Sequence, residues 1–177
     1  MAGRDLSPIR APQPASERQY AELDPVVVIG TGLVGASIGC ALSAAGIQVH
    51  LRDRYRSHAL VAAGLGAGTV SSAQNSAVKL VVVAVPPDAV PEVVERALAR
   101  YRHAVVTDVA SVKKPVMDAL REAGVDLSRY VGSHPMAGSQ YSGPLTASPH
   151  LFVDRRWVIA DGSGSAQAVR RVEALVA

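Results

Sequence analysis

The chain has 177 residues, of which 49% are hydrophobic and only 4% aromatic, so its core must consist mainly of Val, Ala and Leu. This length favours one domain with a sizeable core, and this composition suits a parallel sheet that is buried on both faces. The net charge of +3 is small, which argues against nucleic-acid binding. The chain has one cysteine, no run of 18 apolar residues and no signal peptide. We therefore expect a cytoplasmic protein without a membrane span or a metal site.

The first segment of the chain, residues 1–24, contains three prolines and mixed charges without a regular spacing of apolar residues. Such a segment cannot bury enough apolar surface to offset the entropy of ordering it. We therefore predict a disordered leader over residues 1–24 and a single folded domain over residues 25–177.

A glycine-rich turn follows the first predicted strand, Val26–Ile29, and opens a helix. The turn has the pattern G-x-G-x-x-G: its first glycine permits a tight turn, its second lets a pyrophosphate approach the backbone, and its third lets helix and strand pack closely. The free N–H groups and the dipole at the helix start favour the negative charge of a phosphate. Because the required strand precedes it and a helix follows it, we predict a dinucleotide site here. The predicted cofactor-binding residues of the turn are Gly30, Gly32, Leu33, Val34 and Gly35.

The second predicted strand, residues 48–51, is followed by Asp53, which lies 18 residues beyond Gly35. An acidic side chain at this place accepts hydrogen bonds from the adenosine ribose, whereas the alternative is a solvated aspartate in a turn. Arginines beside it, Arg54 among them, can accommodate the 2′-phosphate of NADP instead. We predict that Asp53 and Arg54 bind the cofactor, with NAD favoured and NADP as the alternative.

Further strands are predicted at residues 80–85, 104–107, 130–132 and 156–160, and further helices at residues 91–102, 114–123 and Ala166–Val176. Strands that alternate with helices predict a doubly wound α/β fold with a parallel sheet of Rossmann type. Ligands of such sheets bind beyond the carboxyl ends of the strands. Val85 ends a predicted strand, and Pro86, Ser111 and His134 each follow one, so we expect them on one rim with the glycine turn. We predict that Val85, Pro86 and Ser111 bind the cofactor there.

Two lysines, Lys113 and Lys114, fall at the predicted start of the helix over residues 114–123. The helix dipole disfavours cations at this end. The pattern indicates either a nearby anion or a solvated helix face, and the solvated face is the more common case.

His134 lies in the sequence GSHPMAG, which has no alternation that would bury it in a core strand. A neutral imidazole can act as a base near neutral pH, although a lone histidine is more often structural. Ser111 could orient this histidine or contact a substrate hydroxyl, and by itself it would be interpreted as a helix N-cap. The other histidines lack metal-ligand spacing, and no G-x-S-x-G sequence indicates a serine hydrolase.

Four blocks of sequence together resemble the N-terminal domain of the prephenate dehydrogenase family, which includes the arogenate dehydrogenases of tyrosine biosynthesis. The blocks are VVIGTGLVGASIG, AVPP, TDVASVK and GSHPMAGSQYSG, with LF and RW downstream, and they cover most of residues 25–160 in the right order. The histidine block is far more specific than the glycine turn. The resemblance implies oxidative decarboxylation of prephenate or arogenate with hydride transfer to NAD(P), giving 4-hydroxyphenylpyruvate or tyrosine.

The resemblance also implies roles for two residues. His134 would accept the proton of the substrate's 4-hydroxyl, which raises the electron density on the carbon that gives up the hydride. Ser111 would hydrogen-bond near the nicotinamide, the histidine or that hydroxyl. Some members carry a glutamate six residues after the histidine, where this chain has Gln140, a neutral amide that cannot act by charge.

The family continues into a helical domain that forms a homodimer and supplies a substrate-binding arginine and a further histidine. We expect that domain to be absent here and the domain over residues 25–177 to be incomplete at its C-terminus. Two other functions remain open: a β-hydroxyacid-type dehydrogenase, which would use a lysine in its second domain and would not need GSHPMAG, and a non-catalytic dinucleotide-binding module. Turnover of prephenate with NAD separates an enzyme from such a module.

Overall fold

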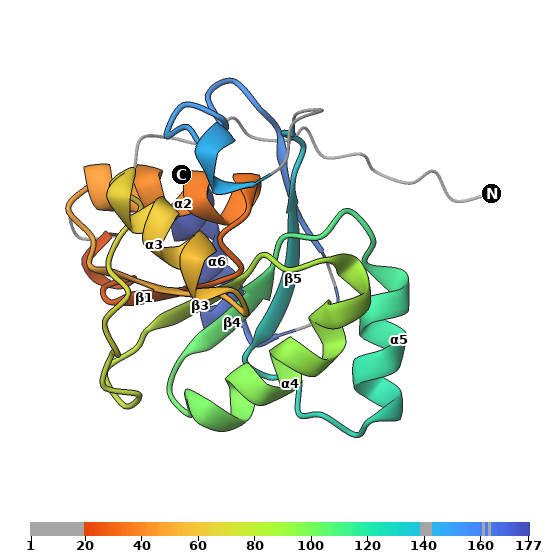
Figure 1. The fold of residues 1–177 in the computed structure, drawn as a ribbon. Helices are drawn as coiled ribbons and strands as arrows, with labels where there is room; N and C mark the ends of the chain where they lie inside the picture. The colour runs from red at the N-terminus through yellow and green to blue at the C-terminus, as the bar shows by residue number, and fades with distance from the viewer. Residues whose placement is uncertain (1–19, 139–142, 161, 163) are drawn as a thin grey trace.

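A single six-stranded sheet forms the centre of the computed structural model, which describes residues 20–138, 143–160, 162 and 164–177 (Figure 1). Its strands are β1 Val26–Ile29, β2 Val49–Arg52, β3 Leu80–Val83, β4 Val105–Asp108, β5 Tyr130–Pro135 and β6 Trp157–Ile159. Their order is β2-β1-β3-β4-β5-β6, and every neighbouring pair is parallel except β5 and β6. The predicted doubly wound α/β fold is confirmed, and its last strand is antiparallel to the others.

Helices cover both faces of this sheet because the strands are apolar on both sides. The helices are α2 Leu33–Ala44, α3 Arg56–Gly64, α4 Val90–Arg100, α5 Lys114–Glu122 and α6 Ala166–Val176, with short 3-10 turns η1 Pro87–Ala89 and η2 Pro144–Thr146. Successive side chains of a strand point to opposite faces. Val26 and Val28 therefore pack with α2, α3 and α6, whereas Val27 packs on the other face with α4 and α5 (Figure 1). No helix in the described part of the chain is long and apolar enough to cross a membrane.

The structure corrects three expectations about the elements. The strand predicted over residues 130–132 continues to Pro135, because Ser133 and His134 pair with Ile159 and Val158 of β6. Helix α3 was not predicted: two of its residues are buried while Leu60 and Val61 are exposed, so its apolar residues do not mark a single face. The expected leader lies mostly outside the described residues, yet Leu23 is fully buried, so the packed chain begins before the expected boundary at residue 25.

Candidate functional site

Two glycines of the turn after β1 are required by the packing of the protein itself. Gly30 has φ +93°, and a Cβ added to it would lie 2.4 Å from the carbonyl oxygen of Ala84. A Cβ on Gly35 would lie 2.0 Å from the carbonyl oxygen of Gly30. Both distances are far below van der Waals contact, so strand β3 and helix α2 can approach the turn only at glycine.

Gly32 differs, because nothing in the protein requires a glycine there. Its backbone is extended, with φ −70° and ψ −166°, and a Cβ added to it would meet no atom within 4 Å. It is the N-cap of α2, which has no side-chain cap and no acidic residue in its first turn. The N–H groups at Leu33 and Val34 thus begin a helix beside open space. These features fit a bound pyrophosphate, since such a ligand needs free N–H groups and a backbone without a side chain.

Asp53 lies against the glycine turn after β2. One of its carboxylate oxygens accepts hydrogen bonds from the backbone N–H of Thr31 at 2.7 Å and from the Thr31 hydroxyl at 2.9 Å. The other oxygen accepts one from the N–H of Tyr55 at 2.9 Å, and the side chain is 11% exposed. Arg54 is exposed beside it, with its guanidinium 4.8 Å from the centre of the Tyr55 ring. Asp53 therefore braces the turn; its contact with a ribose stays a prediction.

The segment after β3 also lies beside the glycine turn. The Ala84 N–H donates to the carbonyl oxygen of Ile29 at 2.7 Å, and Cγ1 of Val85 lies 3.1 Å from the place where a Gly30 Cβ would be. Val85 is half-buried, and Pro86, exposed, precedes η1. The structure thus brings both predicted residues to the edge of the turn.

Ser111 follows β4, and His134 lies near the end of β5. His134 is half-buried, and its Nδ1 lies 3.4 Å from the carbonyl oxygen of Val109. The imidazole thus contacts the backbone of Val109, two residues before Ser111. Ser111 itself is exposed and is not the cap of α5, since that position belongs to Lys113. Gln140 lies outside the described residues.

A buried charged group near this rim was missed from the sequence. The carboxylate of Asp108, at the end of β4, is fully buried. It accepts hydrogen bonds from the Ala110 N–H at 2.9 Å, from the Tyr130 hydroxyl at 2.6 Å and from the Lys113 ammonium. Lys113 thus has an anion near it, whereas Lys114 pairs with Asp118 on the helix surface. The signals that could have revealed the group are Asp108 at the end of an apolar strand and a lysine five residues later.

Burial and charge shift two pKa values in this group. Burial lowers the pKa of Lys113, although the attraction of Asp108 opposes that effect. Burial raises the pKa of Tyr130, and the negative charge of Asp108 and the hydrogen bond to it raise that pKa further. Tyr130 therefore stays protonated as a hydrogen-bond donor throughout the neutral range.

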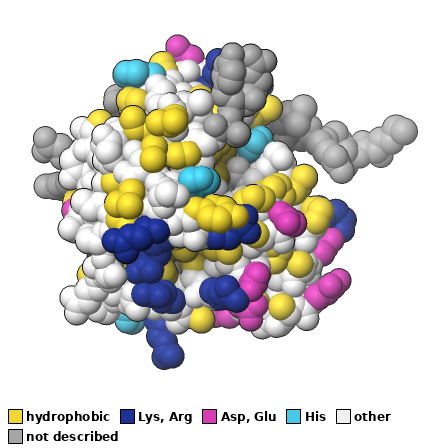
Figure 2. Space-filling view, in the orientation of Figure 1, with side chains coloured by type: hydrophobic (Ala, Val, Ile, Leu, Met, Phe, Trp, Pro, Cys, Tyr) yellow, Lys and Arg dark blue, Asp and Glu magenta, His cyan; other side chains and the backbone are white. Residues whose placement is uncertain are grey.

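The predicted residues lie in one row along the carboxyl edge of the parallel strands. From β2 to β5 the row contains Asp53, the glycine turn, Val85 with Pro86, Ser111 and His134. Four strand spacings separate its ends, about 19 Å. Hydrophobic, basic and histidine side chains meet on the face that Figure 2 shows. Among the described residues no group of three or more His, Cys, Asp and Glu side chains could hold a metal ion.

The parallel strand order, the glycine turn that opens α2 and the acidic residue after β2 define a nucleotide-binding domain of Rossmann type. The family model described as "Prephenate dehydrogenase, nucleotide-binding domain" matches residues 38–177. The chain belongs to this family of prephenate dehydrogenase nucleotide-binding domains, which confirms the resemblance seen in the sequence.

Relatives with known names agree with this assignment. Over 152 residues the chain is 40% identical to a Streptomyces niveus protein named "Probable prephenate dehydrogenase NovF", a match that covers 85% of this chain and 42% of the relative. It is 29% identical to the prephenate dehydrogenase of Bacillus subtilis, covering 86% of this chain and 44% of that protein. The chain therefore spans less than half the length of these two curated relatives.

Two solved structures share the fold at low identity. The prephenate dehydrogenase of A. aeolicus, in complex with hydroxyphenyl propionate and NAD+, matches with a TM-score of 0.76 and 21% identity over 86% of this chain and 56% of its own. The Synechocystis arogenate dehydrogenase matches with a TM-score of 0.75 and 22% identity over 86% of this chain and 55% of its own.

Proposed function

We propose that this chain is the nucleotide-binding part of an NAD-dependent prephenate or arogenate dehydrogenase. The observation that carries the proposal is Gly32, the one glycine of the turn whose side-chain position is open and whose backbone any residue could adopt. Its identity is explained by a ligand that must approach the backbone. The family match and the row of predicted residues along the same rim support the proposal.

The part of the reaction that this chain would perform is the removal of a proton. The substrate loses a hydride from the ring carbon that bears the hydroxyl, and the hydroxyl proton passes to a base. The ring carboxylate then leaves as CO2, its bonding electrons complete the aromatic ring, and the oxygen regains a proton to give the phenol. When bound, the nicotinamide supplies the acceptor for the hydride. His134 would accept the hydroxyl proton, which raises the electron density on the carbon that loses the hydride. Its place on a strand that is paired on the β6 side holds the imidazole more precisely than a loop would.

The preference for NAD follows from the place of Asp53. A carboxylate at the end of β2 accepts hydrogen bonds from a ribose and repels a 2′-phosphate. One oxygen of Asp53 receives two hydrogen bonds from Thr31, whereas the other receives only one, from Tyr55. The second oxygen therefore has capacity for a ribose hydroxyl. Arg54, which is exposed beside it, would be the contact for a 2′-phosphate if NADP bound instead.

The experiment that tests the proposal uses the purified chain and a protein in which the chain is joined to the second half of the Streptomyces niveus relative. Calorimetry measures the binding of NAD+ and NADP+, and absorbance at the reduced-nicotinamide band measures turnover of prephenate and of arogenate. We expect NAD+ to bind to both proteins, and one of the two substrates to be oxidised by the joined protein. Binding without turnover of either substrate would favour a non-catalytic module, and no binding would contradict the proposal.

A further inference from the structure

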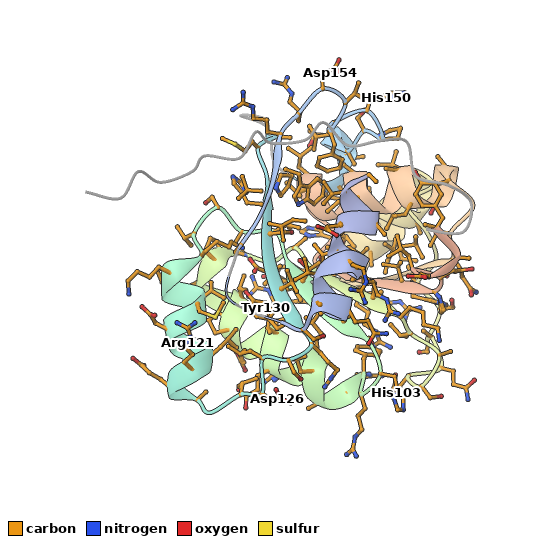
Figure 3. All side chains as sticks on the ribbon, turned by 180° about the vertical axis from the view of Figure 1, so that it is seen from behind. His103, Arg121, Asp126, Tyr130, His150 and Asp154 are labelled. Carbon is orange, nitrogen blue, oxygen red and sulfur yellow. The ribbon has the colours of Figure 1, made fainter. Side chains whose placement is uncertain are left out.

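Asp108, Lys113 and Tyr130 form a polar cluster beneath the rim, which we call the Asp108 cluster. Asp108 is fully buried, Tyr130 is 1% exposed, and the Lys113 side chain is 24% exposed. Tyr130, the first residue of β5, lies near the middle of the molecule, whereas Arg121 lies on α5 toward the outside (Figure 3). A buried carboxylate is stable only when it is paired and hydrogen-bonded, and three donors satisfy this one.

The cluster reaches the face of β5 that carries His134. Tyr130, Gly132 and His134 alternate along the strand, so their side-chain positions lie on the same face. A Cβ on Gly132 would lie 3.1 Å from the Lys113 side chain, 3.3 Å from the Tyr130 hydroxyl and 3.4 Å from the Asp108 carboxylate. Gly132, two residues before the histidine, therefore leaves the room in which the Asp108 cluster assembles.

The cluster also holds the backbone that contacts His134. The Asp108 carboxylate accepts the N–H of Ala110, which fixes the turn after β4. The Asp108 carbonyl oxygen accepts the hydroxyl of Ser133 at 3.0 Å, so the same residue ties β5 to this turn. Val109, between them, donates its N–H to Val83 at 3.1 Å and directs its carbonyl oxygen to Nδ1 of His134.

We propose that Asp108, with Lys113 and Tyr130, is a positioning residue that sets the tautomer of His134 through the carbonyl of Val109. A carbonyl oxygen can only accept a hydrogen bond, so a neutral imidazole facing it carries its proton on Nδ1. Nε2 then has a free lone pair and is the atom able to accept a proton. The tautomer is a property of this chain alone; its consequence for catalysis rests on the function proposed above.

The test is nitrogen-15 NMR of the histidine side chains in the 177-residue chain, at a pH where the imidazoles are neutral. In the unmodified chain we expect His134 to be in the Nδ1–H form. Asp108→Asn removes the charge that holds Lys113 and weakens the turn, and we expect the Nδ1–H fraction to fall below half. Asp108→Asn leaves the half-buried Lys113 without its counter-charge, so Tyr130→Phe is the second variant. It removes one donor to Asp108, keeps the hydrogen bond from Ala110, and should lower the Nδ1–H fraction less.

Two variants serve as matched controls. Like Asp108, Asp126 accepts a hydrogen bond from the N–H two residues later, but Asp126 lies in an exposed turn, so Asp126→Asn is the first control (Figure 3). Tyr101→Phe changes a buried tyrosine whose hydroxyl has no hydrogen-bond partner among the described residues. Both controls should leave the His134 signals unchanged.

Kinetics of the joined protein separate the two proposals. Tyr130→Phe should lower kcat about tenfold with little change in KM, because a misplaced base slows the chemical step rather than binding. An Nε2–H histidine in the unmodified chain, or signals that neither variant shifts, would overturn the positioning role even if the joined protein is active. The expected tautomer shift in a protein that does not oxidise either substrate would leave the positioning role standing and overturn the proposed reaction.

Discussion

At the scale of single residues, a substitution of Gly32 can test ligand binding without disturbing the packing of the protein. Gly32→Ala places a methyl group in open space, so the fold should be unchanged, while NAD+ affinity should fall about tenfold or more because the pyrophosphate loses its close approach. Calorimetry measures the NAD+ affinity, and thermal melting measures the stability of the fold on the same sample.

Gly64→Ala is the matched control for this change, since Gly64 also has an ordinary φ and no atom within 4 Å of an added Cβ, but lies at the end of α3. Gly64→Ala should change neither the NAD+ affinity nor the melting temperature. Gly35→Ala should instead unfold or strongly destabilise the protein, because its Cβ would overlap the Gly30 carbonyl. Unchanged NAD+ affinity in Gly32→Ala would remove the pyrophosphate from this turn.

Asp53 braces the glycine turn through Thr31, and we propose that it also binds the ribose; mutations can separate these two roles. Asp53→Ser should weaken NAD+ binding and narrow the gap to NADP+, since the charge that repels a 2′-phosphate is lost. Thr31→Val removes one donor to Asp53 without removing the charge, and should weaken both cofactors by the same factor. If titration shows the NAD+ to NADP+ ratio unchanged in Asp53→Ser, the residue only braces the turn.

His134 is expected to govern the chemical step. In the joined protein, His134→Asn keeps a hydrogen-bonding group but loses the base, so kcat should fall by about two orders of magnitude or more with KM little changed. His103→Asn, in an exposed turn at the other end of the molecule from the rim, is the control (Figure 3). A near-normal kcat would remove His134 from the mechanism.

At the scale of elements, Arg129 joins the end of α4 to the start of β5. Its guanidinium donates to the carbonyl oxygens of Leu98 at 2.9 Å, Tyr101 at 3.0 Å and Ala104 at 2.8 Å. A cation at a helix C-terminus satisfies carbonyls that have no partner within the helix. Arg129→Ala should lower the free energy of unfolding by about 2 kcal/mol.

Arg129→Lys should recover only part of that loss, because a single ammonium cannot form the same fork. Denaturant unfolding measures both variants, and Arg102→Ala, an exposed arginine in the same region, should have little effect. A loss in Arg102→Ala as large as in Arg129→Ala would show that the three carbonyl contacts are not the cause.

The elements that could be predicted from the sequence are those whose signal is local. Strand β1 and helix α6 have the predicted bounds, since a run of β-branched residues and an amphipathic period define them. The extension of β5 to Pro135 depends on pairing with β6, which lies more than twenty residues away, so no local pattern around His134 reveals it. The same limit applies to the site: the glycine turn is local, whereas the Asp108 cluster is assembled from two strands and the N-cap residue of α5.

At the scale of the whole molecule, binding and catalysis should separate. The glycine turn, Asp53 and Val85 lie together within this chain, so we expect the 177 residues alone to hold a dinucleotide. The rim around His134, by contrast, is open: Val112 is 42% exposed, Met136 55% and Val158 49%. Such apolar side chains around a half-buried histidine leave water in the site and favour association between molecules.

We therefore expect residues 1–177 to bind NAD+ with an affinity close to that of the joined protein, but to oxidise prephenate and arogenate at least about a hundredfold more slowly, because the reacting groups are neither enclosed nor held in line. Light scattering should show self-association of the chain, and Met136→Gln should reduce it because it removes an exposed apolar side chain from the rim. Leu60→Gln, at a residue 51% exposed on α3, is the matched control and should leave the association unchanged. Turnover by residues 1–177 equal to that of the joined protein would contradict this prediction and would mean that the rim residues suffice for the reaction.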